Sequence, residues 1–360
     1  MSTNILFVRL RRSLMLTAAL AVAKAAGAAG PYAYIANGGG FANTDNTISV
    51  IDTSNNTVVK SIPIGNDPGA TNFRTIAMNP SGTRVYVGDY SNSSVHVINT
   101  SNNQAIAEVP VGTRPFGIAV NSAGTQVYVV NDQYSTVTFI DAANNTVIDN
   151  VDVLGSSDLV PHPDPYGVAV NLAGTRLYVT NNADNSVAVI DAVQRKQVAS
   201  IIVGTTAFPG SYGIAVNPAG TRVYVANQGE NTLSIINTAT NTVIKTLEVG
   251  SGPTAVAVSH DGKRVYVSDQ YDGDVWVIDA TTNAKITNVS MGANLAGITI
   301  NPAGTRVYIA DNGLNQVQIL NVADNTRITP AIDVGDQPVS IGQFMRPDNI
   351  FVGGFEPGPK

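Results

Sequence analysis

The sequence predicts an all-β fold, a seven-bladed β-propeller of four-stranded antiparallel blades, on three observations. First, one pattern recurs about every 42 residues: an aliphatic residue, a tyrosine, a second aliphatic residue and then Asn or Asp. A period of this length is typical of repeat arrays. Second, each repeat holds four short β-forming runs divided by turn signals. Third, the first run is rich in Gly and Ala, which suits strands converging at an axis. The repeat tyrosines are Tyr34, Tyr86, Tyr128, Tyr178, Tyr224, Tyr266 and Tyr308.

Residues 114–155 show how one blade is expected to be built. A turn with Gly124 at its left-handed position joins the first two strands, and an Asn-rich turn joins the last two. The second and third strands are aliphatic on both faces, as expected for sheets covered by a blade on each side. The predicted strands, named A, B, C and D in chain order, are residues 116–120, 127–130, 137–140 and 147–153.

The fourth repeat contains the sequence Tyr178-Val179-Thr180-Asn181, and residues 217–222 and 301–306 share the turn Asn-Pro-Ala-Gly-Thr-Arg. In these features the chain resembles the YVTN-type β-propeller family over about residues 32–354. The resemblance implies a propeller. It leaves the activity open, because that family includes cell-surface, periplasmic and enzyme-related members.

The two ends of the repeat array indicate how the ring closes. The chain enters at a B strand, residues 32–36, and no A strand precedes it. Residues 338–344 align with strand A, so they are expected to complete the first blade and leave no open edge. Seven blades result. Residues 350–353 resemble one more B strand and are not assigned to a blade.

Residues 1–28 are interpreted as a signal peptide rather than as part of the fold. Arg9, Arg11 and Arg12 precede a short apolar run, and Ala26-Gly27-Ala28 fits a cleavage site. An uncleaved anchor is the alternative, but the run is shorter than the roughly 20 residues a membrane span needs. Residues 29–360 would then be a single exported domain, periplasmic, secreted or on the cell surface, and expected to be a monomer.

Composition limits the partners of the mature chain. Removing the four basic residues of 1–28 leaves 16 Lys and Arg against 26 Asp and Glu, a formal net charge of −10. Such a surface disfavours nucleic acid and anionic membranes. The chain has no cysteine, so it has neither disulfides nor a lipid-attachment cysteine. No cofactor is expected.

Insertions break the repeat on one side of the ring. The distance from the glycine after strand D to the next repeat tyrosine is 16 residues in the regular blades, but 21, 23 and 20 residues after Gly65, Gly155 and Gly204. The loop 37–47 is also long. In an up-and-down blade, the D–A and B–C connections emerge on the same face, here named the D–A face. The opposite side is the A–B face. Insertions on one face often mark a binding side, although neutral loop growth is the alternative.

Repeated polar residues are expected to be structural. Asn or Asp three residues after each repeat tyrosine would cap the B–C turn. The arginines that open strand B, such as Arg176, would pair with C–D turn aspartates such as Asp52 or Asp191. His96 and Trp276 share a strand C position that varies freely from blade to blade.

The best candidates for a ligand site are residues of the D–A face that do not repeat. They combine aromatic walls with a few polar groups, as small-molecule sites do, and that end of the channel should hold the main pocket. His162 is interpreted as an exposed loop residue rather than a catalytic one, and the three histidines are too dispersed for a metal site. The candidates are Asn72, Phe73, Arg74, Arg114, Phe116, Asp132, Tyr134, His162, Tyr166 and Tyr212.

Two functions fit this pattern. The favoured one is a non-catalytic binding or scaffold protein, with a small molecule or another exported protein as partner. The alternative is a lactonase- or lyase-like propeller enzyme, in which His162, Asp132 and Arg74 or Arg114 would polarise a carbonyl group. An enzyme needs an acid or base and an electrophilic group around one pocket. Because the chain has few glutamates and one well-placed histidine, binding is preferred.

Overall fold

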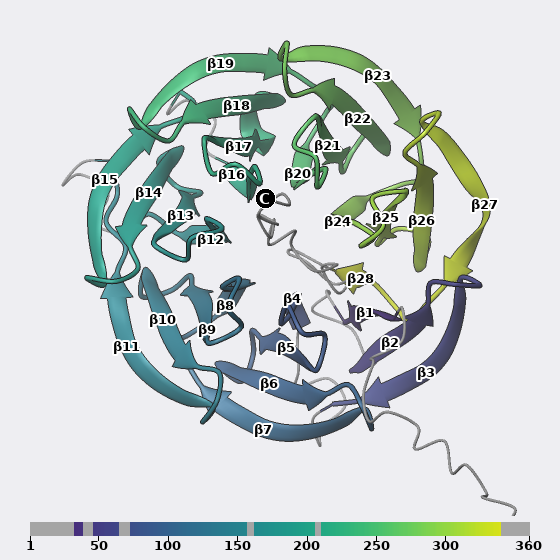
Figure 1. Ribbon diagram of the computed structural model, residues 1–360, viewed down its shortest axis with the longest axis horizontal. Coiled ribbons are helices and arrows are strands. Elements are labelled where there is room, and N and C mark those ends of the chain that lie inside the picture. The colour runs from purple at the N-terminus through teal and green to yellow at the C-terminus, as the bar shows by residue number, and fades with distance from the viewer. Residues whose placement is uncertain (1–31, 39–45, 65–72, 157–161, 206–209, 340–360) are drawn as a thin grey trace, which may run out of the picture.

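Seven four-stranded antiparallel sheets stand in a closed ring, as the computed structural model in Figure 1 shows. It describes residues 32–38, 46–64, 73–156, 162–205 and 210–339. Strand A of each blade lies at the centre of the ring and strand D at the rim. The all-β, seven-bladed prediction is confirmed. No helix within the described ranges is long and apolar enough to cross a membrane.

The strands of the first four blades, from A to D, are as follows. Blade 1 contains β28 (Pro338–Val339), β1 (Tyr32–Asn37), β2 (Thr47–Asp52) and β3 (Thr57–Pro63). Blade 2 contains β4 (Phe73–Met78), β5 (Arg84–Asp89), β6 (Ser94–Asn99) and β7 (Gln104–Pro110). Blade 3 contains β8 (Pro115–Val120), β9 (Gln126–Asn131), β10 (Thr136–Asp141) and β11 (Thr146–Asp152). Blade 4 contains β12 (Pro165–Val170), β13 (Arg176–Asn181), β14 (Ser186–Asp191) and β15 (Lys196–Ile202).

The last three blades follow the same plan. Blade 5 contains β16 (Ser211–Val216), β17 (Arg222–Asn227), β18 (Thr232–Asn237) and β19 (Thr242–Glu248). Blade 6 contains β20 (Pro253–Val258), β21 (Arg264–Asp269), β22 (Asp274–Asp279) and β23 (Ala284–Ser290). Blade 7 contains β24 (Leu295–Ile300), β25 (Arg306–Asp311), β26 (Gln316–Asn321) and β27 (Thr326–Asp333). One 3₁₀ turn, Gln228–Glu230, lies in the B–C loop of blade 5.

The ring closes where β28 pairs with β1. Val339 pairs with Ala36 and Pro338 with Asn37, so the C-terminal strand lies beside the N-terminal one in the A position of blade 1. This is the predicted closure. The remainder of the predicted strand, residues 340–344, and the unplaced residues 350–353 lie outside the described residues, as does the predicted signal peptide 1–28.

The core lies between neighbouring blades. Every repeat tyrosine is at most 3 % exposed. One core cluster combines Tyr86 of blade 2 with Val127 and Ile140 of blade 3, so side chains of adjacent sheets interdigitate. Because each sheet is covered on both faces, its B and C strands are buried on both faces, with a polar residue at one strand C position in most blades.

Most repeated arginines join one blade to the next, which corrects the predicted pairing with aspartates. Arg176 does contact Asp191, with Nη1 and Oδ2 2.5 Å apart. Arg222 of blade 5 instead donates to the backbone oxygen of Ala280 and, at 2.9 Å, to Oδ1 of Asn283 in blade 6. The carboxylate of Asp279 in that turn has other partners, because its Oδ1 accepts hydrogen bonds from two backbone N–H groups of the turn. Equivalent arginine–carbonyl bonds join Arg84 to Ala142, Arg264 to Val322 and Arg306 to Thr53.

The strand C position of His96 and Trp276 does not vary freely; this prediction was wrong. It depends on the residue that ends strand B. Asn131 donates its amide to Thr138 Oγ1 at 2.8 Å, whereas Asp311 accepts a hydrogen bond from Gln318 Nε2 at 2.9 Å. His96 Nε2 likewise lies 3.3 Å from Asp89 Oδ2.

Candidate functional site

The second residue of each A strand defines the D–A end of the channel. The strand register shifts at this point, for example between Phe73 and Thr75 in β4, and such a bulge redirects a side chain. The first residue of β12, Pro165, is buried, whereas the second, Tyr166, is only half-buried. In blades 2 to 5 this second position holds Arg74, Phe116, Tyr166 and Tyr212.

Glycine at the third position brings the A strands close together. A Cβ atom on Gly117 would lie 2.4 Å from the backbone oxygen of Tyr166, and one on Gly167 would lie 2.5 Å from that of Tyr212. Both contacts are far shorter than a van der Waals distance. The absence of a side chain therefore lets the aromatic residues of neighbouring blades meet.

Four aromatic rings form a continuous row across blades 2 to 5. The centroids of Tyr90 and Phe116 are 5.4 Å apart with the rings at 85°. Phe116 and Tyr166 are 3.9 Å apart, and Tyr166 and Tyr212 are 4.4 Å apart. These spacings lie within or just below the usual range for attractive aromatic pairs. We call Tyr90, Phe116, Tyr166 and Tyr212 the aromatic row.

Two arginines lie on the aromatic row. The Cζ atom of Arg74 is 5.5 Å from the ring centre of Tyr90 and 5.6 Å from that of Phe116. The Cζ atom of Arg114 is also 5.5 Å from the ring centre of Tyr90. Cation–π attraction holds guanidinium groups at such distances. Sharing one ring keeps the two cations close together in a protein whose overall charge is negative.

Asp132 completes the group from blade 3. Its Oδ2 lies 4.0 Å from Nη1 of Arg114, and its backbone N–H donates to the backbone oxygen of Arg114 at 3.0 Å. Burial, and then the charge of Asp164, raise the pKa of the Asp132 carboxyl, while Arg114 opposes the shift. Burial also raises the pKa of Tyr166, so its phenol stays protonated and can donate a hydrogen bond.

Hydrogen-bonded amides form the other part of the rim. Gln228 Nε2 donates to Gln270 Oε1 at 2.9 Å, and Gln270 Nε2 donates to Asn294 Oδ1 at 2.6 Å. Asn294 Nδ2 then donates to Asn312 Oδ1 at 3.0 Å. The mouth of the channel is thus aromatic and cationic over blades 2 to 5, and amide-lined over blades 5 to 7.

The predicted site residues divide into two groups. Arg74, Arg114, Phe116, Asp132, Tyr166 and Tyr212 come together as described. Tyr134 is 63 % exposed and His162 is also exposed, and neither contacts the aromatic row. Phe73 is fully buried, with its ring 6.0 Å from that of His96. Asn72 lies outside the described residues.

Tyr90 was missed by the sequence analysis, although a signal for it exists. It lies four residues after a repeat tyrosine, where the other blades carry Gly, Asp, Asn or Gln. An aromatic side chain at this polar loop position departs from the repeat as clearly as Phe116 does.

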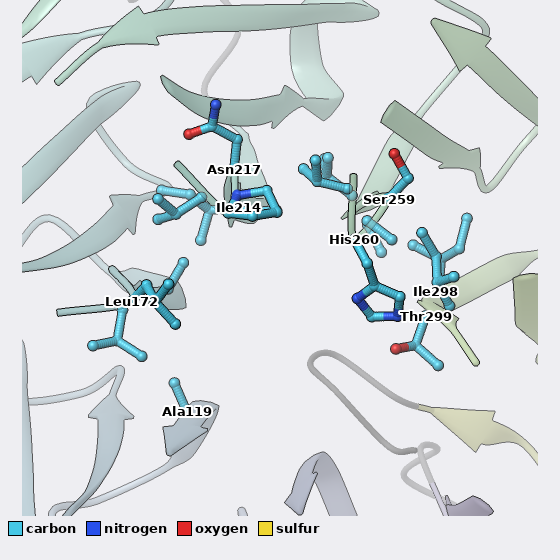
Figure 2. A pocket seen from close by; sticks show the side chains of 18 of the residues that line it. Ala119, Leu172, Ile214, Asn217, Ser259, His260, Ile298 and Thr299 are labelled. Carbon is cyan, nitrogen blue, oxygen red and sulfur yellow. The ribbon is translucent and has the colours of Figure 1, made fainter. Parts of the chain in front are cut away.

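A cavity of about 1160 Å³ lies at the other end of the channel, among the A–B turns. The sequence predicted the main pocket at the D–A end instead. None of the predicted site residues lines this cavity. The reason is side-chain size: the aromatic row occupies the D–A end, whereas small and aliphatic residues border the A–B end, as Figure 2 shows. The described residues include no group of three or more acidic or histidine side chains placed to hold a metal ion.

Comparisons with solved structures support the propeller fold. The β-propeller domain of Cps50 (Swd1) from Myceliophteria thermophila aligns with a TM-score of 0.62 and 12% identity, covering 76% of this chain and 93% of that one. Hydrazine synthase of Kuenenia stuttgartiensis aligns with a TM-score of 0.66 and 20% identity, covering 75% of this chain and 89% of that one. A protein of unknown function from Desulfotomaculum acetoxidans gives 0.69 and 16%, covering 86% and 99%. A Bacteroides fragilis protein described as a 6-phosphogluconolactonase gives 0.67 and 17%, covering 86% and 96%.

No protein-family model and no curated protein sequence matches this chain. The solved structures named above are at or below 20% identity, so they establish the fold rather than an activity. The chain is a seven-bladed β-propeller with one irregular, aromatic and cationic mouth.

Proposed function

We propose that this chain is an exported, non-catalytic propeller that binds a small anionic or carbonyl-bearing ligand at its D–A face. The observation that carries the proposal is the convergence of residues that do not repeat. At the second position of strand A, blades 6 and 7 carry the small residues Thr254 and Ala296. Blades 2 to 5 instead carry Arg74, Phe116, Tyr166 and Tyr212, in mutual contact or on a shared ring.

Arg114 is the residue best placed to contact a ligand. Its side chain is 48 % exposed, and the nearest carboxylate oxygen is 4.0 Å away, beyond hydrogen-bond distance. A planar guanidinium can bind a carboxylate through two parallel hydrogen bonds. The ring of Tyr90 beneath it limits its freedom, so less entropy is lost on binding.

The backbone at Arg114 is left-handed, with φ 61°. Blades 5, 6 and 7 place Gly210, Gly252 and Asn294 at the same position, and blades 4 and 1 place Asp164 and Gln337 there. A non-glycine residue in this conformation costs roughly 1 kcal/mol relative to glycine. Because other long and polar residues share the position, it is the exposed charge of Arg114, and not its backbone conformation, that supports contact with a ligand.

The alternative enzyme has one observation in its favour. Arg114 and Asp132 form a cation and carboxyl pair whose acid has a raised pKa, a combination that could polarise a carbonyl group and move a proton. His162, the third residue of that hypothesis, is exposed and outside this group. The binding proposal needs only the contacts described above.

A thermal-shift screen of the mature chain against small carboxylates, sugar acids and lactones tests the proposal. Binding should raise the melting temperature, and Arg114→Ala should abolish the shift for the same compounds while Lys245→Ala, an exposed residue far from the mouth, should not. Turnover of a lactone that is lost in Asp132→Asn would favour the enzyme. N-terminal sequencing of secreted material tests export, for which a start near Ala29 is expected.

A further inference from the structure

The cavity at the A–B end is built from the repeat itself. Its wall comes from the second half of strand A in blades 2 to 7, and A–B turns form its rim. Half-buried aliphatic side chains border it, including Ile214 and Val216 of β16 and Val258 of β20. Figure 2 shows lining side chains, Ile214 and Ile298 among them, around an open centre, with Ser259 and His260 on one side.

The polar groups of the rim lie in the A–B turns. Asp261 accepts a hydrogen bond from Ser259 Oγ at 2.6 Å, and the exposed Lys263 Nζ lies 4.0 Å from Asp261 Oδ2, beyond hydrogen-bond distance. His260 Nε2 lies 3.0 Å from the backbone oxygen of Asn301, and Arg264 donates to the backbone of blade 7. Among the described lining residues, the charged ones are Asp261, Lys263 and Arg264, which belong to the A–B turn or strand B of blade 6, so the strand A wall itself presents no charge to a ligand.

Each A strand is the inner edge of its sheet, so the wall also carries backbone groups that no further strand pairs. A molecule in the channel could form a few hydrogen bonds with these edges. Its main contact would be with aliphatic side chains, whose removal from water is favourable.

We propose that this cavity is a second binding site, for an uncharged and largely aliphatic small molecule that enters from the A–B face. A volume of about 1160 Å³ is slightly larger than that of typical small-molecule pockets, which are roughly 300–1,000 Å³. The absence of a charge in the described strand A wall favours an uncharged ligand over an anion. The site is independent of the proposed function at the D–A face.

An uncharged, environment-sensitive naphthylamine dye serves as the probe in a fluorescence titration of the full chain. We expect saturable uptake of one dye per chain. Val216→Asp places a carboxylate in the wall and should weaken uptake at least tenfold. Val198→Asp, the same change at an exposed position of the outer strand β15, should leave uptake unchanged.

Arg114→Ala should also leave dye uptake unchanged, which separates this site from the one at the D–A face. If Val216→Asp does not unfold cooperatively, Leu172→Asp at the exposed rim replaces it with the same expectation. The proposal is overturned if the full chain takes up no dye, or if a cooperatively folded wall or rim variant binds it as the wild type does.

Discussion

Asp269 should make the protein less stable as pH rises, and Asp269→Asn should remove this effect. Asp269 ends strand B of blade 6, is fully buried, and neither of its carboxylate oxygens has a hydrogen bond of good geometry. Burial first, and then the charges of Asp272 and Asp274, raise its pKa to about 8, against the opposing effect of Trp276 and the Gly250 N–H.

The sign follows from comparing the folded and unfolded states. Below about pH 4 the carboxyl group is protonated in both states and contributes nothing to the pH dependence of stability. Between about pH 4 and pH 8 only the unfolded chain loses the proton, so the free energy of unfolding falls by about 1.4 kcal/mol per pH unit. From pH 5 to pH 7 the loss is about 3 kcal/mol, or about 5 °C in melting temperature for the roughly 280 residues that the structure describes.

Asparagine resembles the protonated acid in shape but cannot ionise. Melting temperatures of wild type and Asp269→Asn, measured from pH 5 to pH 8, should diverge as pH rises, with the variant higher at pH 8. Asp89→Asn is the matched control at the same position of blade 2. Although burial acts to raise it, hydrogen bonds from His96 and Asn92 hold the pKa of Asp89 below its ordinary value.

The carboxylate of Asp89 therefore stabilises the fold above pH 4, and that contribution is lost on acidification. Asp89→Asn should lower the melting temperature at pH 7, opposite to Asp269→Asn. Parallel pH profiles for wild type and Asp269→Asn would show that Asp269 is ionised in the folded protein, and the argument from its burial would fail.

Three further predictions concern the mouth and the ring. Arg114→Gly should abolish ligand binding without lowering the melting temperature, because glycine relieves the left-handed backbone; calorimetry and thermal melts check this. Arg222→Ala should cost about 1–3 kcal/mol in a denaturant titration, since two inter-blade hydrogen bonds are lost and their acceptors remain. Gly117→Ala should cost about 1–3 kcal/mol by pushing β8 away from Tyr166, and should also weaken binding; an unchanged melt would contradict the close approach of the strands.

The architecture could be predicted from the sequence because each blade repeats the same local signals. In blade 3, strand B was predicted at 127–130 and observed at Gln126–Asn131, since β-forming residues bounded by turns determine a strand locally. Ring closure was predictable as well, because residues at one end of the chain supply the strand missing at the other.

Contacts between blades were harder to predict. The sequence shows that arginine and asparagine recur in other blades at the positions of Arg222 and Asn283. It does not show that the left-handed backbone of Asn283, φ 54°, presents its amide oxygen to the previous blade. The sequence does contain the pairing of strand ends: asparagine at the end of strand B accompanies Ser, Thr or Ala in strand C, whereas aspartate accompanies His96, Trp276 or Gln318.

The candidate site was predictable in part. Departures from the repeat identify Phe116, Tyr166 and Tyr212, and their common position explains why they meet. The cavity at the A–B end was not predictable, because it depends on how much of the channel the side chains fill. That volume is a property of the packed ring and leaves no local pattern in the sequence.

The most direct test of the proposed D–A site is the affinity of the strongest screening compound, measured by isothermal titration calorimetry. Wild type, Arg114→Ala and Lys245→Ala should be compared in the same buffer. Arg114→Ala should weaken binding at least tenfold, about 1.4 kcal/mol, because a charge-assisted contact is lost, while Lys245→Ala should bind as wild type does. Equal affinity for all three proteins would contradict the proposed D–A site.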